Sequence, residues 1–145
     1  MSSKVWEVQL ERTQLQIQEE LASLTLHEDV AATLCTLEAR EIPFAICSNL
    51  ASPYGRVLER LLGNRQFVRC MSYEVGFIKP EPEIYRTVTE IAQVAPAECL
   101  FVGDNLLADY EGPRQFGMRA LYVVRGRPRC RDTIGSLNDI LTAFG

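Results

Sequence analysis

The chain alternates short apolar runs with longer amphipathic segments, and this alternation constrains its fold more than any other feature. Four runs have the length and continuous apolar character of buried strands: PFAIC (43–47), QFVRCM (66–71), ECLFVG (98–103) and RALYVV (119–124). Strands separated by helical segments pair in parallel through right-handed crossovers. The sequence therefore predicts an α/β fold, a Rossmann-like three-layer sandwich with a mostly parallel sheet of about four strands.

Apolar residues at helical spacing predict the helices. The expected ranges are 4–24, about 28–41, 53–63, 81–94, 106–117 and 136–144. The first helix is amphipathic, with an apolar stripe formed by Trp6, Leu10, Ile17, Leu21 and Leu24. That stripe covers a core or forms a dimerisation face. The length of 145 residues fits one domain, 1–145, in which the core starts at residue 25.

Composition and charge exclude several classes of protein. A hydrophobic share of 47%, a charged share of 23% and a net charge of -4 are typical of a soluble globular domain and argue against a nucleic-acid or membrane partner. No stretch is apolar enough to span a bilayer, and the N-terminus is charged, so we expect a cytoplasmic protein. The basic stretch RGRPRCR (125–131) is interpreted as a solvated loop, with contact to a phosphate or a nucleic acid as the alternative.

The five cysteines and the single histidine do not indicate a metal centre. No CxxC pair is present, and three cysteines lie in apolar strand-like runs, so we expect reduced thiols rather than zinc ligands. His27 precedes a predicted helix and has no partner motif, which favours a surface or capping role.

Polar residues follow three of the predicted strands where each one ends. Ser48 and Asn49 follow the first strand, Lys79 lies in the loop after the second, and Asp104 with Asp109 follows the third. Because the carboxyl ends of parallel strands share one edge of a sheet, these side chains can converge on one crevice. A hydroxyl, an amide, a cation and two carboxylates suit a phosphate group and Mg²⁺, which prefers oxygen ligands.

The segments ICSN, IKPEPEIY and VGDNLLAD, in this order, resemble the motifs of the haloacid dehalogenase (HAD) superfamily of hydrolases. The resemblance implies that Ser48, with Asn49 beside it, binds the phosphoryl group and that Lys79 neutralises it. It also implies that Asp104 and Asp109 hold Mg²⁺. The acidic pair favours the phosphatase branch, which hydrolyses small phosphorylated metabolites, over the dehalogenases.

The chain departs from the family pattern before these motifs. Family members begin with a strand that ends in DxDxT or DxDxS, whose first aspartate is the nucleophile, but this chain contains no DxD. Residues 1–24 resemble the last helix of a cap domain, so the core is expected to be truncated. The missing strand is central in the family's sheet, between the strands ending at Cys47 and Gly103. Three alternatives remain: the two strands pair directly, another segment fills the gap between them, or the chain pairs with a second copy of itself.

Several functional hypotheses remain open. Ser48, Asn49 and Asp104 are also common in turns and helix caps, and Lys79 could be a solvated lysine. The main hypothesis is a Mg²⁺-dependent phosphatase that is incomplete as this chain and binds Mg²⁺ weakly. The alternative is a non-catalytic domain that binds phosphate or dimerises through its first helix. A phosphoacceptor receiver domain is rejected, because receivers place their acidic pair first and their lysine last.

Overall fold

A computed structural model describes residues 3–144 of the chain, and it describes the side chains of residues 11–142. The strands are β1 (Ala45–Ser48), β2 (Val68–Met71), β3 (Leu100–Gly103), β4 (Arg119–Val123) and β5 (Thr133–Ile134). The α-helices are α1 (Ser3–Ser23), α2 (Glu28–Ala39), α3 (Ser52–Leu62), α4 (Ser72–Val75), α5 (Pro82–Ala92) and α6 (Gly112–Phe116). Tighter or wider helical turns form η1 (Pro96–Glu98), η2 (Leu106–Glu111) and η3 (Leu137–Phe144). The predicted α/β fold with parallel strands is confirmed.

The strands form two small sheets instead of one. β1 pairs in parallel with β2, and in the second sheet β4 lies between β3 and β5, again with parallel pairing. Within residues 3–144, no backbone ladder joins β1 to β3. The break lies where the resemblance to the family places a further strand, and direct pairing of the two flanking strands is the wrong alternative. The short strand β5 was not predicted, because two residues are too few to show a periodic pattern.

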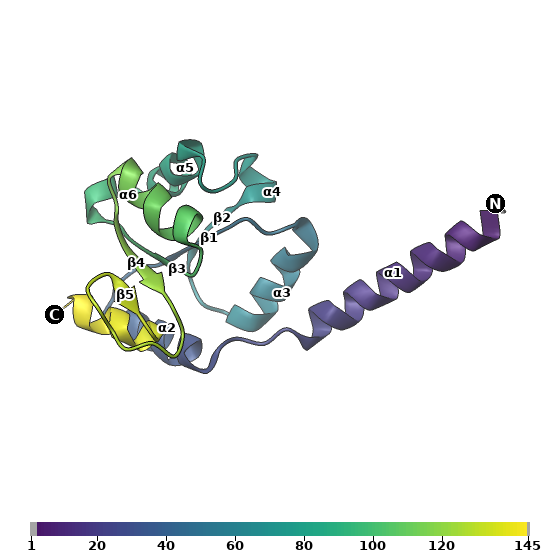
Figure 1. The fold of residues 1–145 in the computed structure, drawn as a ribbon, viewed down its shortest axis with the longest axis horizontal. Helices are drawn as coiled ribbons and strands as arrows, with labels where there is room; N and C mark the ends of the chain where they lie inside the picture. Colours follow the sequence, from purple (N-terminus) through teal and green to yellow (C-terminus); the bar gives the residue numbers. More distant parts are fainter. Residues whose placement is uncertain (1–2, 145) are drawn as a thin grey trace.

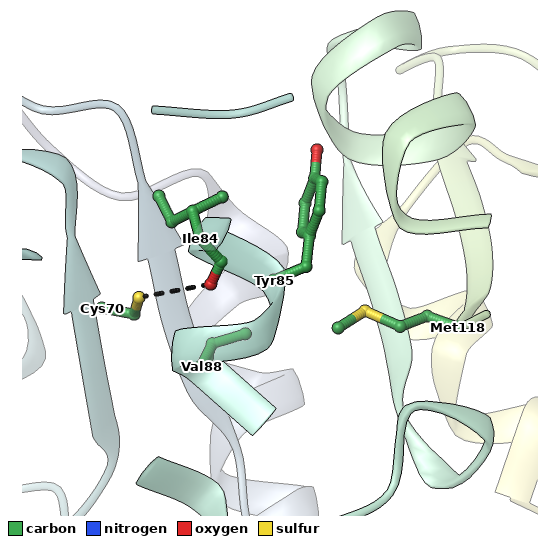
Figure 2. Packing of buried hydrophobic residues seen from close by; sticks show 5 residues of the cluster. All are labelled: Cys70, Ile84, Tyr85, Val88 and Met118. Atoms are coloured by element: carbon green, nitrogen blue, oxygen red, sulfur yellow. Dashed lines mark hydrogen bonds between the residues drawn. The ribbon is translucent and has the colours of Figure 1, made fainter. Parts of the chain in front are cut away.

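Helix α5 covers one face of both sheets. The buried core on this face consists of Cys70, Ile84, Tyr85, Val88 and Met118. Figure 2 shows Cys70 of β2 on one side of α5 and Met118, just before β4, on the other. The Cys70 thiol donates a hydrogen bond to the Ile84 carbonyl over 3.8 Å. In this helix Ile91 is 49% exposed, whereas Tyr85 is fully buried.

Helices α2 and α3 and the segment η3 cover the opposite face. Leu34, Leu37 and Leu62 form one buried cluster there, against which Ile46 of β1 and Leu141 of η3 pack. A second cluster joins η3 to β3, β4 and β5. The Thr33 hydroxyl donates a hydrogen bond to Asn138 Oδ1 over 3.1 Å, which ties α2 to η3. Both covering layers therefore run across the break between the sheets.

Asp29 fixes the start of α2 to the loops that follow β4 and β5. Its carboxylate accepts hydrogen bonds from Arg125 Nη1 (2.9 and 2.8 Å), Ser136 Oγ (2.9 Å) and the Leu137 amide (2.7 Å). Burial alone would raise the pKa of Asp29, but these bonds and the nearby guanidinium lower it to about 2. The carboxylate is thus a structural link across the fold. Residues 125–131 around it are solvent-exposed, as expected for this loop.

Helix α1 projects away from the rest of the molecule (Figure 1). It is attached through α3: Arg60 donates hydrogen bonds to the carbonyls of Leu21 (3.0 Å), Ala22 (3.4 Å) and Leu24 (3.3 Å). The Tyr54 hydroxyl also donates to Glu20 Oε1 over 3.3 Å. Ile17 of the predicted apolar stripe is 42% exposed. The side chains of Trp6 and Leu10 lie outside the described residues. Dimerisation through this helix stays a prediction.

The described residues bear on the expectations about membrane spans and about the cysteines. None of the helices in residues 3–144 combines the length and apolar character needed to cross a bilayer. All five cysteines are free thiols.

Candidate functional site

The centre of the candidate site is a nearly buried ion pair between Lys79 and Asp109. Lys79 Nζ donates a hydrogen bond to Asp109 Oδ1, and the two side chains are 10% and 8% exposed. The ammonium group also lies 5.4 Å from the centre of the Phe101 ring. An ammonium group has three donors. One is used by Asp109, so the pair leaves Lys79 with donors for a further acceptor.

Asn49 positions Lys79 through the backbone. Asn49 Nδ2 donates to the Lys79 carbonyl over 2.9 Å, and the Lys79 amide donates to Asn49 Oδ1 over 2.7 Å. The Lys79–Pro80 peptide bond is cis. Both polar atoms of the Asn49 side chain are therefore engaged in holding the lysine loop against the end of β1. The sequence predicted that Asn49 binds substrate. No sequence pattern indicated that its side chain bonds to the backbone of Lys79, thirty residues away.

Asp109 comes from η2 and lies against the end of β3. Its Oδ2 accepts a hydrogen bond from the Asn105 amide over 3.0 Å, and Asn105 Oδ1 caps the turn by accepting from the Ala108 amide over 2.8 Å. A Cβ atom at position 103 would lie 2.3 Å from the Asp109 carboxyl carbon. Gly103 is thus required for the carboxylate to pack this closely on the strand.

Tyr85 of α5 supports the same turn, a role that was not predicted from the sequence. Its hydroxyl donates a hydrogen bond to the Ala108 carbonyl over 2.6 Å. The ring is fully buried, and Gly112 makes room for it, because a Cβ atom there would lie 2.3 Å from the hydroxyl oxygen. Tyr85 therefore positions Asp109 without touching it. The one available signal was that Tyr85 lies between Ile84 and Val88 on the apolar face of α5.

Ser48 and Asp104 lie at the same edge with free polar groups. Ser48 is half-buried at the end of β1, and Asp104 is exposed directly after β3. In the described part of the chain, neither side chain has a hydrogen-bond or ion-pair partner. The structure therefore brings Ser48, Lys79 and Asp109 to one edge of the fold, while Asp104 stands in solvent beside them.

The described residues at this edge offer few free oxygen ligands to a Mg²⁺ ion. Among the described residues, no group of three or more His, Cys, Asp or Glu side chains could hold a metal ion. The Asp109 carboxylate is already bonded to Lys79 and to a backbone amide. Among the residues that the structure describes, Asp104 is the one free carboxylate at this edge, so these residues do not form a closed Mg²⁺ site. The assignment of Asp104 and Asp109 as a metal pair stays a prediction.

Cys47 lies beside the ion pair and does not replace the missing nucleophile. Burial raises the pKa of its thiol, as does neighbouring Cys70, and the net result is a pKa of about 12 despite the opposing effect of Lys79. A thiol is nucleophilic as its thiolate. At neutral pH Cys47 is therefore mostly in its protonated form, which is the poorer nucleophile.

An open surface groove lies away from this ion pair. It is an open groove of about 660 Å³ lined by the start of α2 and by the loops after β4 and β5, including His27, Asp29 and Arg125. Lys79 and Asp109 are not among its lining residues. Its two principal charges, Asp29 and Arg125, are bonded to each other. We therefore place the candidate site at the Lys79–Asp109 pair rather than in this groove.

Comparisons with known proteins identify the family. A model described as haloacid dehalogenase-like hydrolase matches residues 3–117. Haloacid dehalogenase-like hydrolase domain-containing protein 3 of Homo sapiens is 34% identical over 110 residues, which cover 70% of this chain and 42% of that protein. A phosphoserine phosphatase of Thermus thermophilus is 31% identical over 128 residues, with shares of 81% and 51%. The chain thus spans about half the length of the curated relatives it matches.

Solved structures agree with this assignment. The crystal structure of a HAD phosphatase from Thermococcus onnurineus superposes with a TM-score of 0.76 and 27% sequence identity, covering 89% of this chain and 62% of that one. The family match includes the segments that carry Ser48, Lys79, Asp104 and Asp109. The chain therefore belongs to the haloacid dehalogenase-like hydrolases.

Proposed function

We propose that this chain forms the phosphoryl-binding part of a phosphatase-type hydrolase that acts on small phosphorylated molecules. The observation that carries the proposal is the nearly buried Lys79–Asp109 pair, held at the carboxyl edge of the strands beside an unbonded serine. Two relatives support the phosphatase class by their names: the phosphoserine phosphatase of Thermus thermophilus and a glyceraldehyde 3-phosphate phosphatase of Methanopyrus kandleri, which is 34% identical over 111 residues.

Lys79 and Ser48 would bind the phosphoryl oxygens. The free donors of the ammonium group and the unbonded hydroxyl of Ser48 can each donate to a phosphate oxygen, and a charge-assisted hydrogen bond is the stronger kind. Asn49 contributes by fixing the backbone of Lys79. A phosphate group at this edge therefore meets a preoriented cation and a hydroxyl.

We further propose that the chain alone does not turn over substrate. A covalent aspartyl route requires a carboxylate that can attack phosphorus. Asp109 is bonded to Lys79, Asp29 to Arg125 and Ser136, and Asp132 to Tyr110 and Arg114, while Asp139 accepts backbone hydrogen bonds. Asp104 stands exposed after β3 and carries no base or cation to activate it. The nucleophile would have to come from outside the 145 residues of this sequence.

Magnesium enters the proposal as a weakly bound ion. One free carboxylate with waters and a substrate phosphate is a common way for proteins to bind Mg²⁺. Because Asp109 is engaged, we assign that role to Asp104 alone and expect weak binding. No chemical step is derived from the ion.

A second candidate function is a non-catalytic phosphate-binding domain. The same observation favours it, because the Lys79–Asp109 pair can bind an anion without any nucleophile nearby. The two candidates differ in whether phosphate ester bonds are ever broken at this edge. They agree that phosphate binds there.

The binding claim is tested by titrating inorganic phosphate into the purified chain and following backbone amide shifts by NMR. We expect the largest shifts at Ser48, Asn49 and Lys79. Loss of one hydrogen bond in Ser48→Ala should weaken phosphate binding roughly twofold to tenfold. Ser23→Ala, at the exposed end of α1, is the matched control and should bind like the parent chain. Absence of shifts at these residues would sink the proposal.

The activity claim is tested with an aryl phosphate and Mg²⁺. We expect phosphate release by the chain to equal that of buffer. Release above buffer that disappears in Asp104→Asn would show that the chain is an enzyme as it stands, and it would eliminate the non-catalytic candidate. Release that survives Asp104→Asn would place the chemistry away from this edge.

A further inference from the structure

The loop that follows β4 concentrates positive charge on an acidic chain. Residues 125–131 contain four arginines and no acidic residue, whereas the whole chain carries a net charge of -4. All seven residues are solvent-exposed. Charges of one sign that gather on one surface raise the local concentration of ligands of the opposite sign. The loop therefore attracts anions, although the chain as a whole repels them.

Three of the four arginines have no carboxylate partner in the described part of the chain. Arg129 donates a hydrogen bond to the Thr142 hydroxyl, which is neutral. Neither Arg127 nor Arg131 has a hydrogen-bond or ion-pair partner there. A guanidinium group carries five donors in a planar arrangement that matches a carboxylate. Most of the donors of these three side chains are therefore unused.

The carboxylates around the loop are bonded to other groups. Asp29 accepts from Arg125, the fourth arginine of the loop. Asp132 follows the loop directly, and it lies 3.5 Å from Arg114 Nη1 and accepts a hydrogen bond from the Tyr110 hydroxyl over 2.9 Å. The positive charge of the other three arginines is thus not neutralised by these neighbours.

Backbone hydrogen bonds fix the course of the loop. The Arg127 amide donates to the Val124 carbonyl over 3.1 Å, and Cys130 and Thr133 exchange two backbone bonds of 2.9 and 2.8 Å. Gly135 packs on the loop, because a Cβ atom there would lie 1.9 Å from the Arg127 carbonyl oxygen. A loop that is already ordered loses less conformational entropy when it binds a ligand. The arginines are therefore carried by a defined backbone and not by a flexible tail.

The arginines are spread along the length of α2. Arg125 bonds to Asp29 in the first turn of this helix. Arg129 bonds to Thr142 of η3, and Arg40, directly after α2, donates to the preceding carbonyl of η3 over 3.3 Å. With 12 residues, α2 is about 18 Å long. An extended polypeptide covers that length with about five or six residues. The charge therefore fits a linear ligand better than a single small anion.

We propose that the loop of residues 125–131 binds an extended acidic segment of a partner protein, with carboxylates at alternate positions. Side chains two residues apart in an extended segment point to the same side, so one face of such a peptide presents a row of carboxylates. Guanidinium and carboxylate groups form paired, charge-assisted hydrogen bonds. This inference goes beyond the proposed function and does not depend on it, because Ser48 and Lys79 take no part.

A peptide fits this surface better than a nucleic acid. Proteins bind single-stranded nucleic acids by stacking bases on aromatic side chains, and residues 124–133 contain no aromatic residue. Arg125 and Gly126 also line the open groove at the start of α2, together with Leu26 and Ala32. Beside the arginines, this groove offers a recess with apolar atoms, which suits a side chain of a bound peptide.

The test measures binding of a fluorescein-labelled peptide of about eight residues, in which glutamate and serine alternate, to the full chain by fluorescence anisotropy. We expect saturable binding that weakens as salt rises from about 0.02 to about 0.2 M, because salt screens exposed charges. The double variant Arg127→Gln with Arg131→Gln loses two exposed ion pairs and should bind the peptide about fivefold to thirtyfold more weakly.

The matched control is the double variant Arg12→Gln with Arg56→Gln. These arginines are exposed on α1 and α3, have no partner in the described structure, and change the net charge by the same amount. We expect this variant to bind the peptide within about twofold of the parent chain, because its charges lie away from the loop.

Each other outcome overturns the proposal. Absence of saturable binding at low salt would show that the loop does not hold an acidic peptide. Equal weakening by the two double variants would show attraction by net charge alone. Equal binding of a peptide with glutamine in place of glutamate would show that carboxylates are not recognised. Tighter binding of a thymidine oligonucleotide of similar length, lost in the Arg127→Gln with Arg131→Gln variant, would show that the loop binds nucleic acid instead.

Discussion

Two carboxylates of this chain are nearly buried and form ion pairs, and they differ in where their cations lie. Asp29 accepts hydrogen bonds from Arg125, Ser136 and the Leu137 amide, and its cation, Arg125, is 37% exposed in the loop after β4. Asp109 accepts from Lys79 and the Asn105 amide, and its cation, Lys79, is 10% exposed at the carboxyl edge of the strands, where unbonded Ser48 also lies. A buried carboxylate in an ion pair therefore does not identify a functional site by itself. The position of the cation at the carboxyl edge of the strands, beside a second free donor, separates the two pairs.

The largest effect is expected when the Lys79–Asp109 pair loses its cation. Lys79→Met leaves the 8% exposed carboxylate of Asp109 without a counter-charge, and we expect the free energy of unfolding to fall by about 3 to 5 kcal/mol. Urea unfolding followed by circular dichroism measures the loss. The double variant Lys79→Met with Asp109→Asn removes the unpaired charge and should recover most of the stability. A loss below about 1 kcal/mol in the single variant would mean that the pair is not shielded from water.

The Asp29 network should show its strength through pH. The pKa of Asp29 is about 2 in the folded chain against a model value of 3.8, so its contribution is fully present above pH 3.8 and is lost as the pH falls through about 2. The shift corresponds to about 2 kcal/mol. We therefore expect Asp29→Asn to be about 2 kcal/mol less stable than the parent chain near neutral pH, with the difference shrinking in acid. Urea titrations at several pH values measure this difference, and a constant gap would contradict the assignment.

A smaller effect is expected from the support beneath Asp109. Tyr85→Phe removes the hydroxyl that donates to the Ala108 carbonyl and should lower the free energy of unfolding by about 1 kcal/mol. The matched control is Tyr122→Phe, because the Tyr122 hydroxyl has no hydrogen-bond partner in the described structure. Thermal unfolding of both variants provides the comparison. Equal losses would show that the Tyr85 hydrogen bond contributes nothing.

The smallest effect is expected at Asp104, which the sequence grouped with Asp109. Its carboxylate is exposed and unbonded in the described structure, so Asp104→Asn should change the free energy of unfolding by less than about 0.5 kcal/mol. The same urea assay measures it. A larger loss would reveal a partner for Asp104 and would remove the distinction between the two aspartates.

Most of the fold followed from the alternation of apolar runs and helical segments. The four predicted strands are found within two residues of their expected starts, because continuous apolar runs bounded by turns are a strong local signal. β5 and α4 were missed, since two residues and four residues are too short to show any periodicity. The sequence left open whether β1 and β3 pair directly. The answer depends on long-range packing by α5, α2 and η3, which holds the two sheets together without a ladder between them.

The sequence predicted which residues form the site, but not the hydrogen bonds that hold them in place. The ends of parallel strands place Ser48, Lys79 and Asp109 at one edge, and this follows from topology alone. That Asn49 bonds to the backbone of Lys79, or that Tyr85 reaches the Ala108 carbonyl, follows from loop geometry that a sequence does not encode locally. The separation of Asp104 from Asp109 has the same origin, since η2 turns the second carboxylate back onto Gly103.

The broken sheet also has a consequence for folding cooperativity. β1 and β2 lie within residues 45–71 and β3 to β5 within residues 100–134, so each sheet pairs strands that are close in sequence. Local pairings form quickly, and units that share few hydrogen bonds can open separately. In the described chain no ladder joins the two sheets, and α5 and the α2–η3 contact transmit stability between them. We expect native-state exchange to show two cooperative units with different opening free energies, where a continuous sheet would show one.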